Sequence, residues 1–347
     1  MSTDELYMRR CFDLARLGAG SVSPNPMVGA VLVHQGRILG EGFHRQYGQA
    51  HAEVNAVNSV ASKDLHLLAE ATLYVSLEPC CIFGKTPPCT NLILEHRIPK
   101  VVISCLDQTP GVAGQGVEIL RSAGVEVISG VLEAEGFRLS AIRNTFVTQQ
   151  RPYILLKFAK TRDGFFAPDT GLQHWISNAY SKRLVHRWRS EVDAILVGTN
   201  TALHDNPQLS NRLYFGKSPL RLVLDKNLRL PPTLALFDGS SPTLVFTAQE
   251  SAPKNALPNV EYIALDFQKD WLPQMLNILA ERKITSLMVE GGAQLLQAFI
   301  EAGLWDEARV LTGEALLFKG IAAPNLAVNP AFAGSIGGDW LEVFYRD

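Results

Sequence analysis

Short apolar segments alternate with amphipathic segments through the first 130 residues. Ser2 and Glu5 have the spacing of a capping box and predict a helix at the start of the chain. The β-branched stretch 28–33 is followed by the turn dipeptide Gln35-Gly36, so we expect a hairpin that returns over 37–40. The same pattern predicts helices over 51–60, 90–96 and 116–123, and strands over 72–77, 101–105 and 125–128.

A second series of elements starts after Arg151-Pro152. Residues 130–150 are more polar, and we place the domain boundary near 147–151, with one domain over 1–147 and another over 148–347. The second domain is predicted to have strands over 153–158, 193–197, 220–224, 243–247, 286–289 and 308–311, and helices over 178–190, 271–282 and 293–302. This alternation predicts two α/β domains, the first with largely parallel late strands. The halves share no internal repeat, which indicates two different modules.

Composition narrows the class of protein further. A chain of 347 residues with 47% hydrophobic and 19% charged residues is typical of two globular domains. Its 32 Lys and Arg residues against 34 Asp and Glu residues give a formal charge of −2, so it has no general attraction for nucleic acid or anionic membranes. An anionic ligand must therefore be held by a few local cations.

The cysteines and the N-terminal segment indicate a cellular compartment. Three of the five cysteines are crowded into Cys80, Cys81 and Cys89, which favours a local site in a reducing compartment over a disulfide framework. The segment MSTDELYMRR is polar and acidic, unlike an export signal, and the apolar stretches are far shorter than the ~20 residues that span a bilayer. We therefore expect a cytoplasmic protein.

His51, Cys80 and Cys89 have the chemistry of a catalytic zinc site. One imidazole and two thiolates suit zinc and leave the fourth tetrahedral position for water. Zinc lowers the pKa of a bound water, so that a hydroxide nucleophile exists near neutral pH. Glu53 follows His51 by two residues and is placed to carry the proton from that water to a ring nitrogen and then to departing ammonia.

His51 and the cysteines also have two simpler interpretations. A single histidine such as His51 is more often structural than metal-binding. A closed structural zinc site would need a fourth protein ligand, and Cys81 is awkward in that role because it directly follows Cys80. The full set agrees better with the zinc deaminases, which combine His-x-Glu with a Pro-Cys motif. In those enzymes two residues separate the cysteines, whereas eight residues separate Cys80 from Cys89.

Three longer segments, PNPMVGAVLV, EGFHRQYGQAHAE and LEPCCIFGKTPPC, resemble the deaminase half of the bifunctional deaminase/reductase family of riboflavin biosynthesis. The wide cysteine spacing is a trait of that family. The resemblance implies a five-stranded, cytidine-deaminase-like three-layer domain that holds one zinc ion per chain through His51, Cys80 and Cys89, with Glu53 as the proton carrier. It also implies a substrate pocket lined by Asn25, His44 and Lys85. Cys81 stands where the family usually has Ser.

The second half lacks the Gly-x-Gly-x-x-Gly fingerprint of dinucleotide-binding Rossmann domains. Its segments LLKFAKTRDGFFA, GTNTALHDNPQLSNR and MVEGGAQLLQAF instead resemble the reductase half of the same family, whose fold is similar to dihydrofolate reductase. The resemblance implies NADPH as the second cofactor. The small residues of GTNTALHD and VEGGAQLL suit a phosphate cradle; the less favoured alternative for Gly291-Gly292 is a tight turn without a ligand.

The resemblance also assigns residues in this half. Cofactor contacts fall on Ala159, Trp175, Thr201, Asp205, Gly291 and Gly292. Substrate contacts fall on Arg189, Leu209, Arg212 and Glu290, and the two guanidinium groups suit a ribose phosphate. Asp205 is the predicted catalytic residue that orients the sugar carbon. Gln173 and Lys226 stand where the family usually has Ser.

These assignments predict a bifunctional enzyme. It would deaminate 2,5-diamino-6-(5-phosphoribosylamino)pyrimidin-4-one and then reduce the ribosyl side chain to ribityl with NADPH. We expect a homo-oligomer with a small phosphorylated pyrimidine as substrate and with neither nucleic acid nor membrane as partner. The alternatives are a deaminase of tRNA adenosine or free nucleosides, and a reductase or binding protein whose zinc domain is degenerate and non-catalytic. Intact Glu53 argues against the degenerate domain.

Overall fold

The computed structural model describes residues 2–169, 175–249 and 257–346. The chain divides into two compact units, Met1–Arg151 and Pro152–Asp347. The boundary expected between residues 147 and 148 falls inside helix α6 (Ala141–Gln149). Gln173 lies outside the described residues.

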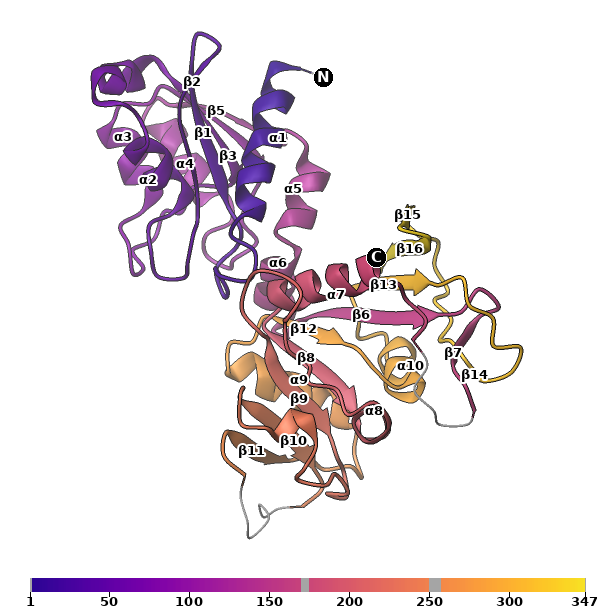
Figure 1. The fold of residues 1–347 in the computed structure, drawn as a ribbon. Coiled ribbons are helices and arrows are strands. Elements are labelled where there is room, and N and C mark those ends of the chain that lie inside the picture. The colour runs from indigo at the N-terminus through magenta and orange to yellow at the C-terminus, as the bar shows by residue number, and fades with distance from the viewer. Residues whose placement is uncertain (1, 170–174, 250–256, 347) are drawn as a thin grey trace. The chain divides into compact units, whose positions relative to one another are not determined.

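The first unit is built on a five-stranded sheet in the order β2-β1-β3-β4-β5 (Figure 1). Strand β1 is antiparallel to β2 and β3, whereas β3, β4 and β5 are parallel, as the sequence predicts. The strands are β1 (Gly29–His34), β2 (Arg37–Phe43), β3 (Thr72–Leu77), β4 (Lys100–Cys105) and β5 (Glu126–Ser129). The other elements are α1 (Thr3–Arg16), α2 (Ala52–Asn58), η1 (Ser62–Glu70), α3 (Cys89–Glu95), α4 (Gln115–Ser122), α5 (Glu133–Leu139) and α6.

Alternation along β1 produces the three layers of this unit. Ala30 and Leu32 pack with α2, α3 and α4 on one face of the sheet. Val31 and Val33 pack on the other face with α1 and with Val131, Leu132 and Leu139, which lie just before and at the end of α5. Successive side chains of a strand point to opposite faces, so a strand buried on both sides needs apolar residues throughout. The predicted three-layer domain is confirmed.

The second unit is built on a nine-stranded sheet in the order β11-β10-β9-β8-β12-β6-β13-β16-β15. The strands from β11 to β13 in this order run parallel, and the β16 and β15 strands are antiparallel to their neighbours. The sheet strands are β6 (Tyr153–Lys160), β8 (Ala194–Gly198), β9 (Leu220–Leu224), β10 (Thr243–Thr247), β11 (Val260–Ala264), β12 (Ser286–Val289), β13 (Glu307–Thr312), β15 (Phe332–Ile336) and β16 (Asp339–Tyr345). The remaining elements are β7 (Phe165–Ala167), β14 (Ile321–Ala322), α7 (Ala179–Glu191), α8 (Thr199–Asp205), η2 (Ala235–Phe237), α9 (Trp271–Glu281) and α10 (Ala293–Glu301).

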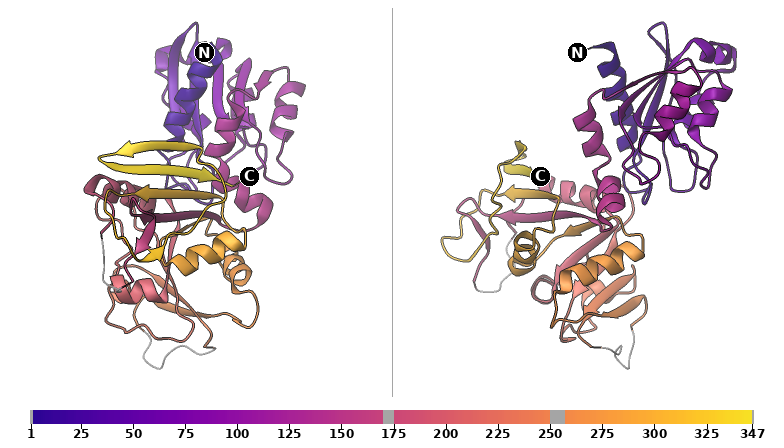
Figure 2. Two further views of the ribbon diagram at one scale, coloured as in Figure 1. Left: turned by 90° about the vertical axis from the view of Figure 1, so that its right-hand side faces the viewer. Right: turned by 180° about the vertical axis from the view of Figure 1, so that it is seen from behind.

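The central strands of this sheet are also covered on both faces (Figure 2). Ile154 and Leu156 of β6 pack in a core with α9 and α10. Leu155, between them, packs in a second core with α7 and α8. The predicted α/β architecture of this half is therefore confirmed as well.

Several elements were not predicted from the sequence. The polar stretch 130–150 forms α5 and α6, and residues 199–205 form helix α8, which is not among the helices predicted above. The hairpin of β15 and β16 turns at Gly337-Gly338, where both φ angles are positive. Its strands expose Phe332 and Trp340, so they lack the continuous apolar run of a central strand.

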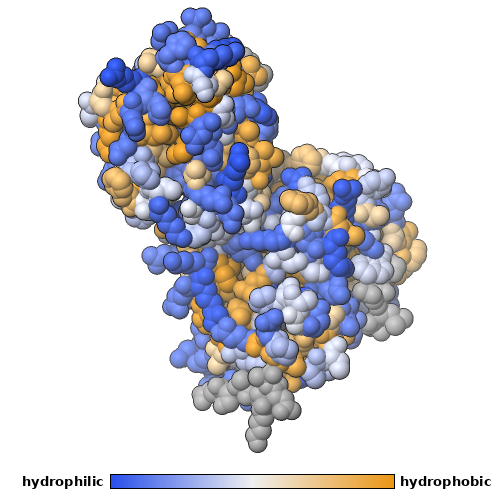
Figure 3. Space-filling model, turned by 60° about the vertical axis from the view of Figure 1, so that its left-hand side comes forward, coloured by the Kyte–Doolittle hydropathy of each residue, from blue (hydrophilic) through white to orange (hydrophobic). Residues whose placement is uncertain are grey.

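The surface agrees with the balanced composition. Hydrophilic residues surround smaller hydrophobic areas on the face of both units shown in Figure 3. Among the described residues, no helix combines the length and apolar character needed to cross a membrane.

Candidate functional site

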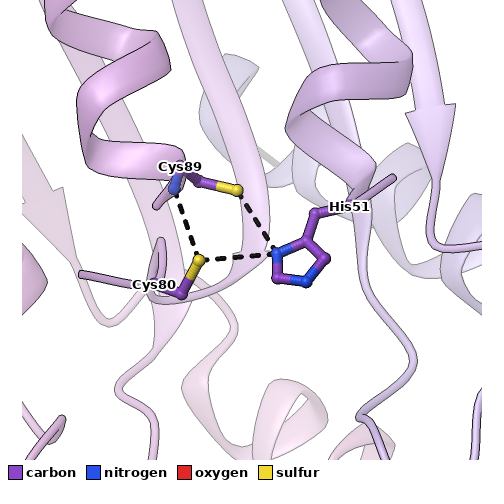
Figure 4. Close-up of side chains that lie close together, drawn as sticks. All are labelled: His51, Cys80 and Cys89. Carbon is purple, nitrogen blue, oxygen red and sulfur yellow. Dashed lines mark hydrogen bonds between the residues drawn. The ribbon is translucent and has the colours of Figure 1, made fainter. Parts of the chain in front are cut away.

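Three predicted metal ligands come together in the first unit (Figure 4). His51 occupies the position just before α2, Cys89 is the first residue of α3, and Cys80 lies in the loop after β3. One donor atom from each side chain lies within 4.8 Å of the others. Among the described residues, this group does not include Cys81. An imidazole with two thiols is a donor set that fits zinc and leaves a fourth position open.

The geometry identifies the ligand atoms. Nδ1 of His51 lies 3.4 Å from Sγ of Cys80 and 3.4 Å from Sγ of Cys89. The other ring nitrogen, Nε2, lies 3.4 Å from the Thr86 hydroxyl. The hydrogen bond from Cys89 and the nearby His51 ring lower the pKa of the Cys80 thiol, despite the opposing effect of burial. Cys80 is thus held as the thiolate, the form that binds metal, while the same contact and burial raise the pKa of Cys89.

Glu53 is almost completely buried beside this cluster, with 3% of its surface exposed. Burial raises the pKa of Glu53 to about 7, and the charge of Cys80 acts in the same direction. A carboxyl group with a pKa near neutrality can both accept and release a proton under physiological conditions. The position of Glu53 on the first turn of α2 therefore agrees with its predicted role as a proton carrier.

A second buried carboxylate, Glu78, fixes the loop that carries Cys80. Its Oε2 accepts hydrogen bonds from the backbone N–H groups of Asp107 at 3.2 Å and Gly114 at 2.9 Å. Its Oε1 accepts from Gly116 at 2.8 Å and Val117 at 3.3 Å. Glu78 thereby ties the residues before Cys80 to the start of α4. Sequence reasoning missed this role because the partners lie 29 to 39 residues away.

The cluster opens into a cavity of about 500 Å³, within the range usual for ligand sites. Asn25, His44 and Lys85 all line it, as predicted. His44 lies with its Nδ1 3.0 Å from the Ala50 carbonyl and its Nε2 3.1 Å from Nδ2 of Asn25. Burial lowers the pKa of His44, so the ring is neutral, donates from Nδ1 and accepts from the Asn25 amide. Nζ of Lys85 lies 4.1 Å from the ring centroid of Tyr47.

Arg143 is a cavity residue that sequence reasoning did not find. It comes from α6, in the stretch that had been interpreted only as polar, and it lines the same cavity as Lys85. Its nearest sequence neighbours carry no motif, so only the fold brings it to this site.

A second cavity, of about 630 Å³, lies in the second unit. Most predicted cofactor and substrate residues line it; these are Ala159, Trp175, Thr201, Asp205, Arg189, Leu209, Arg212 and Glu290. Gly291 and Gly292 lie beside it, because a Cβ on either would come within 3.2 Å of a Thr201 side-chain atom. Gly292, with a φ of 73°, stands just before α10. This close backbone approach fits the predicted cradle for a nucleotide cofactor.

Arg189 and Glu290 form a largely buried ion pair in this cavity, with side chains 12% and 6% exposed. Nε and Nη2 of Arg189 each lie 2.7 Å from a carboxylate oxygen of Glu290, and Nη1 donates to the Ser210 carbonyl. Nζ of Lys157 lies 3.9 Å from the same carboxylate. Burial raises the pKa of Glu290, but Arg189 and Lys157 outweigh it and keep the pKa below its ordinary value. The two N–H groups of Arg189 that would suit a phosphate therefore bind the Glu290 carboxylate instead.

Arg212 is more open to a ligand. Its Nη1 donates to Oε1 of Gln208 at 2.7 Å and to the Ser210 hydroxyl at 3.0 Å. Its backbone N–H donates to Nδ1 of His186 at 2.9 Å. Burial and the charges of Arg189 and Arg212 lower the pKa of His186 to about 4, so this cavity residue is neutral at pH 7. His186 and Lys157 are two lining residues outside the predicted set.

Comparison with known proteins places both halves in one family. Residues 1–105 match the cytidine and deoxycytidylate deaminase zinc-binding region, and residues 152–318 match the RibD C-terminal domain. Riboflavin biosynthesis protein RibD from Aquifex aeolicus is 39% identical over 94% of this chain and 91% of its own length. The chain belongs to the RibD family. RibD from Bacillus amyloliquefaciens is 40% identical over 95% of the chain and 89% of its own length.

Solved RibD structures agree with both folds. The crystal structure of the diaminohydroxyphosphoribosylaminopyrimidine deaminase/5-amino-6-(5-phosphoribosylamino)uracil reductase from Thermotoga maritima is 38% identical, covers 99% of each chain and has a TM-score of 0.90. Acinetobacter baumannii RibD is 30% identical, covers 99% of this chain and 98% of its own, and has a TM-score of 0.86. The expected deaminase-like and dihydrofolate-reductase-like domains are therefore confirmed.

Replacing the three clustered cysteines one at a time should separate ligands from the bystander. We expect Cys80→Ser and Cys89→Ser each to lose bound zinc, because each removes one of three converging donors. Cys81→Ser should keep it. Elemental analysis of the purified RibD-family protein and its variants measures zinc per chain. Loss of zinc only in the Cys81 variant would contradict the ligand assignment.

Glu78→Gln should weaken zinc binding although Glu78 is not a ligand. An amide presents one acceptor oxygen and an NH₂ group to four N–H donors, so the Cys80 loop loses part of its anchor. We expect zinc affinity to fall about 10- to 100-fold, the usual cost of losing a partner that orients a ligand. Competition with a chelator measures it. Glu118→Gln, an exposed change on α4, is the control, and equal affinities in the two variants would disprove the positioning role.

Proposed function

We propose that this protein is the bifunctional deaminase and reductase of riboflavin biosynthesis. The observation that carries this function is the cluster of His51, Cys80 and Cys89 beside buried Glu53, in a chain that matches RibD over both units. The substrate is 2,5-diamino-6-(5-phosphoribosylamino)pyrimidin-4-one. Its ring amine is hydrolysed in the first unit, and its ribosyl group is then reduced to ribityl in the second. We further propose that the protein is cytoplasmic and forms a homo-oligomer.

The deaminase step requires water to replace an amine on the pyrimidine ring. Zinc, when bound by His51, Cys80 and Cys89, would supply Lewis-acid activation of that water. Glu53 accepts a proton from the water and delivers it to the ring nitrogen, and then carries the remaining hydroxyl proton to the amine, which leaves as ammonia. His44 and Asn25 form one wall of the cavity and hold the ring against the cluster. Intact Glu53 also argues against a degenerate zinc domain.

The reductase step requires an opened sugar and a hydride. NADPH, when bound beside Gly291, Gly292 and Thr201, would supply the hydride. Asp205 at the end of α8 orients the sugar carbon, and Arg212 contacts the ribose phosphate. The opened ring oxygen must take a proton. Lys157 lies in the same cavity with its side chain 16% exposed, and its Nζ is 3.9 Å from the Glu290 carboxylate. Positioning of both reactants is the main contribution of the protein.

One assay tests the whole proposal. Purified protein is given the phosphorylated diaminopyrimidine, with and without NADPH. Ammonia should be released in both cases, and NADPH should be oxidised only after deamination. Release of ammonia without later oxidation of NADPH would exclude the reductase function. Oxidation of NADPH with pre-deaminated substrate, but no release of ammonia from the diaminopyrimidine, would indicate a degenerate zinc domain.

Glu53→Gln should abolish deamination and keep zinc. The amide has nearly the same shape but cannot accept the proton from water. Ammonia release should fall by at least about 100-fold, the lower end of the usual contribution of general acid–base catalysis. Reduction of pre-deaminated substrate serves as the control and should persist. Ammonia release near the wild-type rate would contradict the proton-carrier role.

Asp205→Asn and Arg212→Ala should affect the second reaction selectively. We expect Asp205→Asn to lower reduction strongly while ammonia release persists, because the two sites lie in different units. Arg212→Ala should mainly weaken substrate binding, by about 1.5–3 kcal/mol, the range for a hydrogen bond to a charged group. NADPH oxidation and ammonia release are measured on the same preparations. Unchanged NADPH oxidation in both variants would exclude this reductase site.

A further inference from the structure

Arg143 lines the deaminase cavity without an assigned role. We propose that it binds the phosphate group of the pyrimidine substrate and thereby makes this site select phosphorylated over unphosphorylated pyrimidines. This inference rests on the proposed function, since it concerns the substrate of the same cavity.

The first argument is the placement of the guanidinium group. Nη1 of Arg143 lies 3.5 Å from the Pro24 carbonyl, and Nη2 donates to the Thr109 hydroxyl at 3.2 Å. These two neutral acceptors hold the side chain from α6 over the cavity. An arginine has five N–H donors, so these two bonds leave further donors for a ligand.

The second argument is that, among the described residues, no carboxylate lies close enough to Arg143 for an ion pair, although Asp107 lines the same cavity. The buried Nε of Arg143 has no hydrogen-bond partner within the described part of the chain. Burial lowers the pKa of Arg143 from its ordinary value, and the charge of Asp107 opposes this only in part. A guanidinium remains charged in proteins, so a partly desolvated one is stabilised by an anionic ligand.

The third argument is the order of residues along one wall of the cavity. The rings of His51 and His44 meet edge to face with centroids 5.3 Å apart, and His44 contacts Asn25. Asn25 directly follows Pro24, whose carbonyl lies beside Arg143. This wall therefore runs from the metal ligand through two polar groups to a cation. A pyrimidine that reacts at the metal and passes His44 and Asn25 would bring its ribose phosphate toward Arg143.

The charge of each part of the substrate indicates which cavity residues bind it. The pyrimidine ring is neutral and offers hydrogen-bonding atoms, for which His44 and Asn25 suffice. The phosphate is the charged group, and guanidinium binds phosphate through paired N–H donors. Lys85 is a second cation on the same cavity and is exposed, whereas Arg143 is half-buried. Both cations can act on one phosphate.

The test compares two substrates in three proteins. Wild type, Arg143→Gln and Arg143→Lys are assayed for ammonia release with the phosphorylated pyrimidine and with its dephosphorylated riboside. We expect Arg143→Gln to raise KM for the phosphorylated substrate about 10- to 100-fold, with a much smaller change in kcat. The preference in kcat/KM for the phosphorylated substrate should fall by a similar factor. Arg143→Lys keeps the charge and should recover part of that preference.

Arg97→Gln is the matched control, because Arg97 is exposed and does not line the cavity. Zinc content and reductase activity show whether each variant is intact. Equal losses on both substrates would overturn the inference and indicate that Arg143 only supports the Pro24 and Thr109 segments. Unchanged kinetics in Arg143→Gln, or a lysine variant no better than the glutamine variant, would also overturn it. Wild type that releases no ammonia from the phosphorylated pyrimidine would instead contradict the proposed function itself.

Discussion

Glu78 accepts hydrogen bonds from four backbone N–H groups between residues 107 and 117, and it stands two residues before Cys80. The metal donors come from three separate segments and need to converge within a few ångströms. Two of them, His51 and Cys89, are fixed by the starts of helices. Cys80 lies in a loop, and the buried carboxylate ties that loop to α4. The shape of the cavity, the position of Glu53 beside the cluster and the cavity wall that leads to Arg143 all depend on this convergence.

In the second unit, largely buried charges neutralise each other in an ion pair. Arg189 and Glu290 satisfy each other through two short hydrogen bonds, and Lys157 adds a second cation to the same carboxylate. Breaking such a pair on one side leaves an uncompensated charge, which costs about 3–5 kcal/mol. The cluster therefore stabilises the cavity wall as well as lining it. Arg212, whose side chain bonds to neutral groups within the described part of the chain, is the cation better suited to an incoming phosphate.

The sequence was sufficient where the signal is local. The capping box of Ser2 and Glu5 forms as predicted, and so does the hairpin turn at Gln35-Gly36, where both φ angles are positive. The zinc ligands were recognisable because His-x-Glu and Pro-Cys belong to a known motif, although the spacing of the two cysteines departs from it. The second cavity was predictable mainly by resemblance, since its lining comes from many segments.

The sequence was insufficient where the deciding partner is distant. Arg189 was assigned to a phosphate, yet its fork pairs with Glu290, 101 residues away. Arg143 lies beside the Pro24 carbonyl at the cavity, although the two residues are 119 positions apart in the sequence. The β15–β16 hairpin has a local turn signal in Gly337-Gly338, but no long apolar run accompanies it. Periodicity finds buried elements best, so exposed edge strands and short helices such as α5 escape it.

The backbone amide of Cys89 donates a hydrogen bond to Sγ of Cys80 at 3.3 Å. A thiolate that shares its negative charge with an amide hydrogen donates less electron density to a metal ion. Two thiolates would otherwise neutralise much of the charge of a divalent cation and blunt its electrophilic character. Hydrogen bonding around the ligands is one way in which a protein tunes its metal. A zinc ion held here would keep more of its electron-pair-accepting character, because this amide draws charge from one of its two sulfur ligands.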